Sequence, residues 1–307
     1  MYIDLIGKRN WYFGASAILI IAGLATLIIF GLPLSIDFTG GSKLEFQLPT
    51  ASNLSTSGVN GVLLSQGIDS SIVQLSDENV VIIRTRELDE ESQTALRSAL
   101  GERFGSEVVV LRAESVGPSV STEVGWRALQ AVAIASIGIV IYIWFAFRGV
   151  PNAERYGVTA LLAMLHDVLV VLSFAAIVGQ VFGWEVDALF LTAVLTVIGY
   201  SVHDTIVVFD RVRENRIIYP RADFPEVVNH SVVQTLDRSI NTQLSTAFTL
   251  LALALFGGDT IRPFVVVLLV GVLSGTYSSV FIAAPLLVEW DVRGWGNRLS
   301  GRQRTAS

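Results

Sequence analysis

The sequence has no cysteine among its 307 residues, so neither a disulfide framework nor a thiolate metal site can form. It has only three histidines, His166, His203 and His230, and they are too far apart along the chain to show the spacing of metal ligands. No set of a nucleophile and a base is recognisable either. We therefore expect no metal site, no bound cofactor and no catalytic residue.

Charged side chains are also scarce. They make up 16% of the chain, whereas hydrophobic residues make up 52%, which is too apolar for a soluble globular domain. The formal net charge of −6 argues against nucleic acid as a partner. The first apolar run lacks a small-residue cleavage site, so we expect a retained membrane span rather than a signal peptide.

Six apolar runs are long enough to cross a bilayer as helices, which takes about 20 residues each. They predict an α-helical polytopic membrane protein. The six transmembrane helices are predicted near residues 11–32, 126–147, 156–178, 188–210, 239–257 and 263–288.

Lysine and arginine gather in the short connections on one side of these spans. They lie before the first span, between the second and third, between the fourth and fifth, and after the sixth: Lys8, Arg9, Arg148, Arg155, Arg211, Arg213, Arg216, Arg221, Arg293, Arg298, Arg302 and Arg304. The short connections on the other side hold only Arg262. The positive-inside rule then predicts that both termini are cytoplasmic.

Residues 33–125, between the first two spans, form the one long polar segment, and we predict that they are an extracytoplasmic domain. Its β-rich stretches, two helical stretches and turn-like residues predict the order βαβ-βαβ of a ferredoxin-like α/β fold. Asp89 is the predicted N-cap of the second helix. The strands are predicted near 42–48, 71–75, 80–85 and 107–113, a turn at 76–79, and the helices near 55–67 and 89–104.

The chain is thus predicted to have four parts. Residues 1–32 hold the cytoplasmic N-terminus and the first transmembrane helix, and 33–125 hold the exterior domain. Residues 126–290 hold transmembrane helices two to six, and 291–307 form a cytoplasmic tail. The cytoplasmic loop 211–238 is predicted to be a solvated connector, with a short surface helix near 225–235 as the alternative.

Asp204 lies in the apolar part of the fourth span, where an ionisable side chain costs about 2.5–3.5 kcal/mol. Helical projection places it with His203 and Tyr200 on one polar arc. A structural acid could be replaced by Asn or Ser at lower cost, whereas a group that must change its charge could not. We therefore predict that Asp204 binds and releases a proton; a purely structural acid is the alternative.

The fifth span carries a longer polar stripe, formed by Arg238, Thr242, Ser245 and Thr249, with Asn241 and Thr246 beside it. Lipid cannot satisfy such a stripe, so we expect it to face helices or water. Arg238 is the predicted counter-ion of Asp204. In the alternative, its side chain snorkels to the headgroups without a partner.

Two further polar or small-residue features lie in the third and sixth spans. His166 and Asp167 lie near mid-bilayer depth, where they either support proton coupling or cross-link helices. Gly271 and Gly275 form a small-residue seam that we interpret as a site of close helix packing rather than of mechanism.

These residues resemble the motifs of the SecF family, within the RND transporter superfamily. The resemblance covers nearly the whole chain, from residue 35 to about 287. It is carried by SIDFTGGS at 35–42, HDV at 166–168, IGYSVHDTIVVFDRVREN at 198–215, QTLDRSIN at 234–241, FGG at 256–258 and GTYSS at 275–279. The sister family, SecD, normally has a longer exterior region and a different fourth-span motif.

The resemblance implies an accessory subunit for protein export across the cytoplasmic (inner) membrane. Such a subunit works with SecD and the SecYEG channel on a translocating preprotein, and is driven by proton-motive force rather than by ATP. The acid and the arginine of the family match Asp204 and Arg238. As half of an RND-type bundle, the chain would expose a polar surface to membrane lipid unless a SecD-like partner covered it.

Two departures and two alternatives stay open. His203 stands where relatives often have Asn, and it is either a second titrating group or a hydrogen-bond partner. Ser121 stands where the family usually has glycine, which could change the bend before the second span. The alternatives are a proton-driven RND exporter of small molecules or lipids, for which the exterior segment is small, and a passive chaperone or scaffold without ion coupling.

Overall fold

The computed structural model describes residues 4–51, 53–69, 71–76, 79–150, 152–258 and 260–293. They form two compact units, one made of residues 34–129 and the other of the segments before and after it. Asp77 and Glu78 of the predicted turn lie outside the described residues, as do residues 294–307 of the predicted tail.

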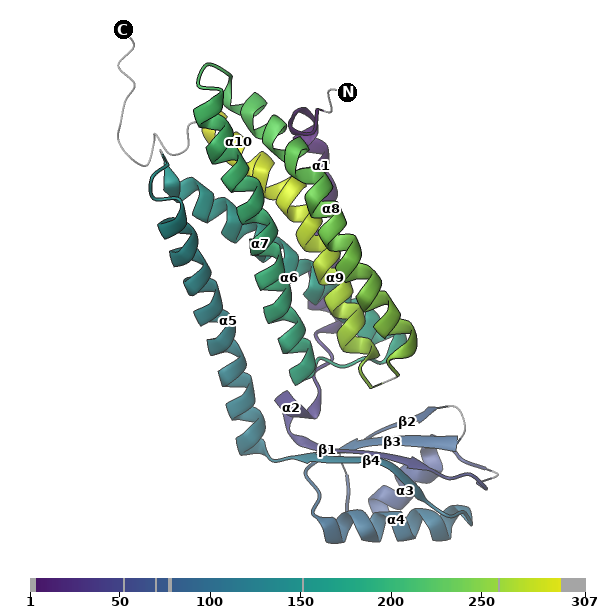
Figure 1. Cartoon of the computed structure of the whole chain (residues 1–307). Coiled ribbons are helices and arrows are strands. Elements are labelled where there is room, and N and C mark those ends of the chain that lie inside the picture. Colours follow the sequence, from purple (N-terminus) through teal and green to yellow (C-terminus); the bar gives the residue numbers. More distant parts are fainter. Residues whose placement is uncertain are drawn as a thin grey trace. The chain divides into compact units, whose positions relative to one another are not determined.

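Most of the chain outside residues 34–129 is helical (Figure 1). Six helices are long and apolar enough to cross a membrane, which confirms the predicted number of spans. The first five contain α1 (Arg9–Phe30), α5 (Pro118–Ala146), α6 (Ala153–Phe182), α7 (Ala188–Ile218) and α8 (Phe224–Phe256). The sixth runs through α9 (Arg262–Ser278), a π-helical turn (Ser279–Ala283) and α10 (Ala284–Arg293).

The predicted solvated connector at 211–238 is wrong, because nearly all of it is helical. α7 continues to Ile218 and α8 begins at Phe224, so that only residues 219–223 connect them. The alternative, a short surface helix, falls within α8. Ion pairs within one turn support the polar end of α7; in one of them Arg211 Nη1 lies 2.9 Å from Glu214 Oε2.

Buried contacts between the two helical extensions explain why this segment is not a loop. Asn215 of α7 is 1% exposed, and its Nδ2 donates to Ser231 Oγ and to Gln234 Oε1, both at 2.9 Å. Val228 and Val232 of α8 are fully buried beside this contact. The length of an apolar run therefore predicts only the part of a helix that lipid could surround, and not the full extent of the helix.

The centre of the bundle is formed by α6, α7 and α9, whose apolar segments are half buried, whereas α1, α5 and α8 expose most of theirs. α7 and α9 approach closely along Gly271 and Gly275. A methyl group at Gly271 would press into the side chain of Val197, and one at Gly275 would lie 3.2 Å from the Cα of Ser201. The two glycines therefore permit the contact between the helices.

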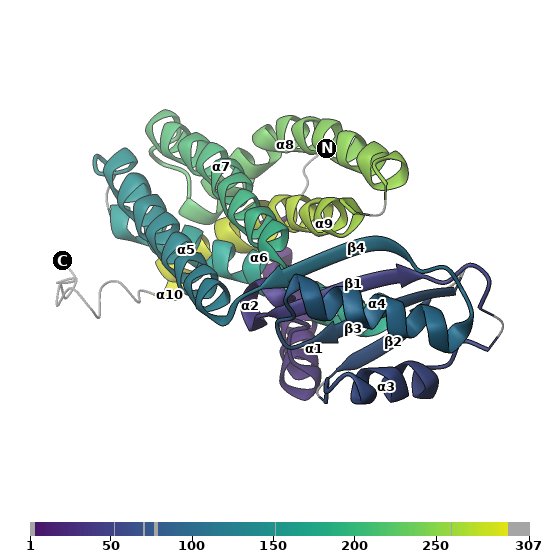
Figure 2. The ribbon, with the colours of Figure 1, turned by 90° about the horizontal axis from the view of Figure 1, so that it is seen from below.

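The unit of residues 34–129 contains an antiparallel sheet in the order β2-β3-β1-β4. Both α3 and α4 lie against one face of it (Figure 2). The element order β-α-β-β-α-β is as predicted. The bounds are β1 Gly41–Gln47, α3 Thr56–Ser65, β2 Ile72–Ser76, β3 Val80–Thr85, α4 Glu90–Phe104 and β4 Val109–Val116, and a short helix, α2 (Ile36–Thr39), precedes β1.

The core of this unit follows from the alternation of its strands. Val81 and Ile83 of β3 are fully buried, and they pack with Leu44 of β1 and with Leu96 of α4. Asp89 is the N-cap of α4, as predicted: its Oδ1 accepts a hydrogen bond from the backbone N–H of Ser92 at 3.0 Å.

Candidate functional site

Two carboxylates are buried in the helix bundle. Asp167 lies on α6 and is fully buried, and Asp204 lies on α7 and is 3% exposed. Their surroundings differ, and the difference bears on which of them could carry a proton.

Asp167 is surrounded by hydrogen-bond donors. Ser201 of α7 donates to it at 2.5 Å, and Ser274 and Ser278 of α9 donate at 2.6 and 2.5 Å. His166 Nδ1 lies 3.0 Å from the same carboxylate. A carboxylate has about four acceptor positions, and the three serine hydroxyls donate to three of them. The cluster therefore joins three helices through one carboxyl group.

The cluster continues to α1 through His166. His166 Nε2 lies 3.2 Å from Ser16 Oγ, which donates to the hydroxyl of Tyr277 at 3.2 Å. The Tyr277 hydroxyl donates in turn to the backbone oxygen of Tyr12 at 3.2 Å. The π-helical turn follows directly after Ser278, a feature frequent at functional sites.

Asp204 has far fewer partners. Gln243 Nε2 of α8 donates to Asp204 Oδ2 at 2.8 Å, and this is the only side-chain hydrogen bond to the carboxyl group in the described part of the chain. His203 Nδ1 lies 3.8 Å from Oδ1, with most of its side chain exposed. Gln243 is 5% exposed, and its Oε1 is buried without a hydrogen-bond partner.

The structure pairs Asp204 with Gln243 rather than with Arg238. Within the described ranges, Arg238 forms no ion pair closer than 4.0 Å. Instead it lines an open polar cavity of about 490 Å³ between α5, α7 and α8, together with Asp210, Arg213 and Glu214. Arg238 precedes Gln243 by five residues, or about 7.5 Å of helix rise, and so lies at a different depth.

The other polar residues predicted on α7 and α8 lie on the surface of the single chain. We call Tyr200, His203, Asn241, Thr242 and Ser245 the polar band; all are exposed. The hydroxyls of Thr242 and Ser245 donate to backbone oxygens four residues earlier, at 2.9 and 3.0 Å. These two hydroxyls are therefore satisfied within their own helix, and helical projection alone does not distinguish this from a buried contact.

Sequence reasoning missed the residues that hold the two acids. Gln243 stands next to Thr242, and the projection followed the hydroxyl stripe instead. Ser274 and Ser278 have i, i+4 spacing on α9, which was a usable signal of one shared face. Ser201 gave no signal, because its partner lies on another helix.

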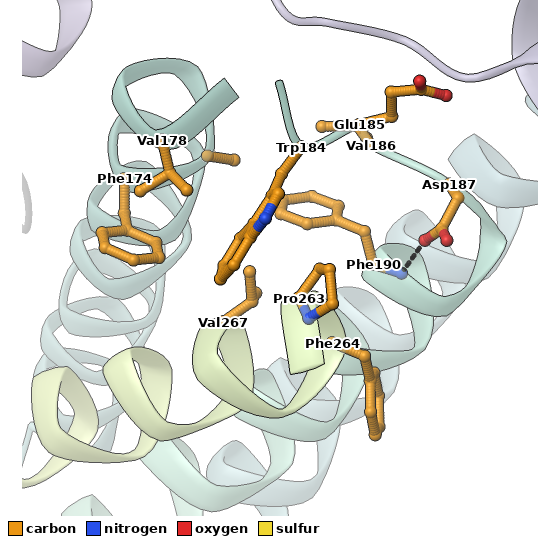
Figure 3. Close-up of a pocket in the computed structure, with 11 residues that line it drawn as sticks. Phe174, Val178, Trp184, Glu185, Val186, Asp187, Phe190, Pro263, Phe264 and Val267 are labelled. Carbon is orange, nitrogen blue, oxygen red and sulfur yellow. Dashed lines mark hydrogen bonds between the residues drawn. The ribbon is translucent and has the colours of Figure 1, made fainter. Parts of the chain in front are cut away.

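A second cavity lies where α6 ends and α7 and α9 begin (Figure 3). Trp184 and Phe190 line it with Phe174, Pro263 and Val267, and Asp187 beside it caps α7 by accepting from the N–H of Phe190 at 2.8 Å. Its free volume of about 20 Å³ has room for about one water molecule. We interpret it as helix packing rather than as a ligand site.

Comparison with known families gives two matches. Residues 97–293 match the family described as "Protein export membrane protein SecD/SecF, C-terminal". Residues 26–48, which include Gly40 and Gly41, match the "SecD/SecF GG Motif".

Individual proteins are similar over nearly the full chain. A "Protein translocase subunit SecF" of Anaerolinea thermophila is 50% identical over 306 residues, with 99% of each chain covered. A "Protein translocase subunit SecDF" of Bacillus subtilis is 38% identical, over 94% of this chain and 38% of that one. The crystal structure of SecDF from Thermus thermophilus is similar with a TM-score of 0.80 and 29% identity, over 95% of this chain and 39% of that one.

Proposed function

The chain belongs to the SecD/SecF family of protein-export membrane proteins and is an accessory subunit of the Sec protein translocase, and we propose that it couples the proton-motive force to late steps of translocation through Asp204. One observation carries this proposal. Asp204 is buried in an apolar helix and accepts a single side-chain hydrogen bond, and no lysine or arginine nitrogen lies within 4.0 Å of its carboxyl group among the described residues.

A buried carboxyl group without a cation favours its neutral form, and a nearby positive charge or water favours its ionised form. If α7 and α8 move relative to each other, Asp204 alternates between the two surroundings and so takes up and releases a proton. Moving one charge through 100 mV supplies about 2.3 kcal/mol, which is enough to bias a conformational equilibrium more than tenfold. Arg238, beside an open polar cavity, supplies the positive charge in the ionised state.

The polar band supports a SecD-type partner. In the single chain it is exposed beside helices that lipid would otherwise surround, and lipid offers no partner for the Asn241 amide or the His203 ring. The SecDF relatives join a further segment to the part that matches this chain. We infer that this segment's counterpart covers the polar band, and that the pair acts at the SecYEG channel on a preprotein, in contact with membrane lipid.

The topology that we propose follows the arginine distribution. Both termini lie in the cytoplasm, and the unit of residues 34–129 lies outside. The strand order β2-β3-β1-β4 with two helices on one face supports a ferredoxin-like class for that unit. No bound cofactor enters the proposal, because the gradient itself is the energy source.

The test is preprotein export in membrane vesicles that contain the complete translocase, measured with the proton gradient present and then collapsed. Wild type should lose export when the gradient is collapsed, whereas Asp204→Asn and Arg238→Ala should already be slow in its presence. Thr26→Val is the control, because Thr26 is only partly buried on α1 and its hydroxyl donates to a backbone oxygen of its own helix. If all four proteins respond alike to the gradient, the chain has no role in proton coupling.

The same assay separates the alternatives. A passive chaperone or scaffold keeps its activity in Asp204→Asn, because Asn preserves shape and hydrogen bonding. An exporter of small molecules or lipids would respond to added substrate and not to preprotein.

A further inference from the structure

Only one of the two polar atoms of the Gln243 amide has a hydrogen-bond partner. Its Nε2 donates to Asp204 Oδ2 at 2.8 Å, while its Oε1 is buried without a partner. The second carboxyl oxygen, Oδ1, lies 3.8 Å from His203 Nδ1. Gln243 therefore offers one engaged donor and one unpartnered acceptor beside a carboxyl group that, when ionised, can only accept.

A proton on Asp204 removes this mismatch. A neutral carboxylic acid has one O–H donor and one carbonyl acceptor, in the complementary order to the carboxamide of Gln243. With the proton on Oδ1, that oxygen donates to Oε1 while Nε2 continues to donate to Oδ2. Exchanging the amide nitrogen and oxygen leads to the same conclusion, because two acceptor oxygens would then face each other until the acid held a proton.

We propose that Gln243 is the hydrogen-bond acceptor for the proton that Asp204 carries, so that the side chains of Asp204 and Gln243 are joined by two hydrogen bonds when Asp204 is neutral and by one when it is ionised. This inference rests on the proposed proton-coupling role of Asp204. It adds a positioning residue and states how the protonation state reaches α8, the helix that bears Arg238 and most of the polar band.

The other charged or titratable groups around Asp204 do not supply this acceptor. His203, on the same helix, is mostly exposed and faces Oδ1 only at 3.8 Å. Arg238 of α8 is a donor alone. From α6, His166 and Asp167 are already engaged with each other and with the serines of α7 and α9. On α9, Tyr277 is engaged with Ser16 and Tyr12.

The comparison with Asp167 sharpens the assignment. Asp167 receives hydrogen bonds from three serine hydroxyls, whereas Asp204 receives one side-chain hydrogen bond, from an amide whose own oxygen has no partner. Two carboxyl groups whose surroundings differ in this way take different roles in one site. In this assignment Asp204 is the proton carrier.

Infrared spectroscopy of the full chain, assembled with its SecD-type partner in lipid nanodiscs, tests this directly. The carbonyl band of protonated Asp204 is the band that disappears in Asp204→Asn. In Gln243→Met, which keeps the side-chain length without its polar atoms, the band should move to higher frequency, and gradient-driven export should fall about tenfold, the effect of losing one net hydrogen bond. Gln243→Asn, with a shorter amide, should show the same shift if Gln243→Met does not assemble.

Ser239→Ala is the matched control, because Ser239 is also buried on α8 with an unpartnered hydroxyl, one turn from Gln243. It should leave both the band and export unchanged. A band that has the same frequency in wild type and in both Gln243 variants overturns the inference while leaving proton coupling intact. If Asp204→Asn exports with full gradient response, the proposed function fails first, whatever Gln243 does.

Discussion

The carboxylate of Asp167 and the hydroxyl of Ser278 lie 2.5 Å apart, and Ser278 is the last residue of α9 before the π-helical turn. The acid of one helix is thus bound at the point where another helix changes its winding. The contact stabilises the bundle whether or not Asp167 ever changes its charge, so its energetic effect can be measured apart from export.

Ser278→Ala should lower the free energy of unfolding of the bundle by about 1–2 kcal/mol, since one donor to a buried carboxylate is lost and interhelical hydrogen bonds in membranes contribute about that much. Asp167→Ala should be more destabilising, because it leaves three serine hydroxyls and an imidazole without their acceptor. The measurement is unfolding of the purified chain in detergent micelles. Thr26→Val should stay at the wild-type value, and a Ser278→Ala protein equal to it would mean that the contact contributes nothing.

Gly271→Ala should destabilise the contact of α7 with α9 by about 1–3 kcal/mol, because the new methyl group meets Val197 and the helices must separate. Gly138→Ala on α5 is the matched control: no atom lies within 4 Å of its added methyl group. There the higher helix propensity of alanine predicts a gain of up to about 1 kcal/mol. The same unfolding assay compares the two, and equal effects of both substitutions would contradict the close approach.

The cap of α4 should weaken in acid. Hydrogen bonds from Ser92 lower the pKa of Asp89 below its ordinary value, so the folded state favours the carboxylate. Its stabilising effect is present above the unfolded pKa of about 3.9 and is lost as the pH falls through the lower folded value. Hydrogen exchange of the first amides of α4, compared with Asp89→Asn at each pH, is the measurement.

Asp89→Asn keeps a capping side chain without a charge. In this variant the protection of the first α4 amides against hydrogen exchange should therefore not depend on pH in that range. The difference in amide protection between wild type and Asp89→Asn should therefore become smaller as the pH falls below about 3.9. A constant difference down to the lowest pH would show that the charge of Asp89 does not stabilise the helix.

The sequence predicted the number of spans because the free energy of burying backbone in lipid depends on length and apolarity, and both can be counted. It did not predict where α5 and α8 begin or where α7 ends. These helices extend beyond their apolar segments. Contacts such as the hydrogen bond from Asn215 to Ser231, sixteen positions apart, stabilise the extensions. Such contacts depend on tertiary packing.

The same limit applies to the site. The cost of burying a charge marked Asp204 and Asp167. Helical projection placed Asp204 on one arc with His203 and Tyr200, whereas the structure buries Asp204 and exposes the other two. Projection does not give depth, so Arg238 was expected where Gln243 is found. Projection also cannot distinguish an exposed polar stripe from a buried one. The hydroxyls of Thr242 and Ser245 donate to backbone oxygens of α8 itself, so they need no partner from another helix. The hydrogen-bond partners of Asp167 and Asp204 come from other helices, so they can be identified only from the packed bundle.

The absence of cysteine makes the partner surface accessible to experiment, because any cysteine introduced is the only thiol of the chain. Tyr200→Cys and Ser245→Cys, in the exposed polar band, should react with a water-soluble maleimide in the detergent-solubilised chain and be protected when a SecD-type partner is bound. Glu102→Cys, exposed on α4 in the unit of residues 34–129, should react equally in both states. Gln243→Cys, at a buried position, should react slowly in both. If the polar-band thiols label at the same rate with and without the partner, another surface binds it, and Asn241, His203 and their neighbours must face water or lipid in the working complex.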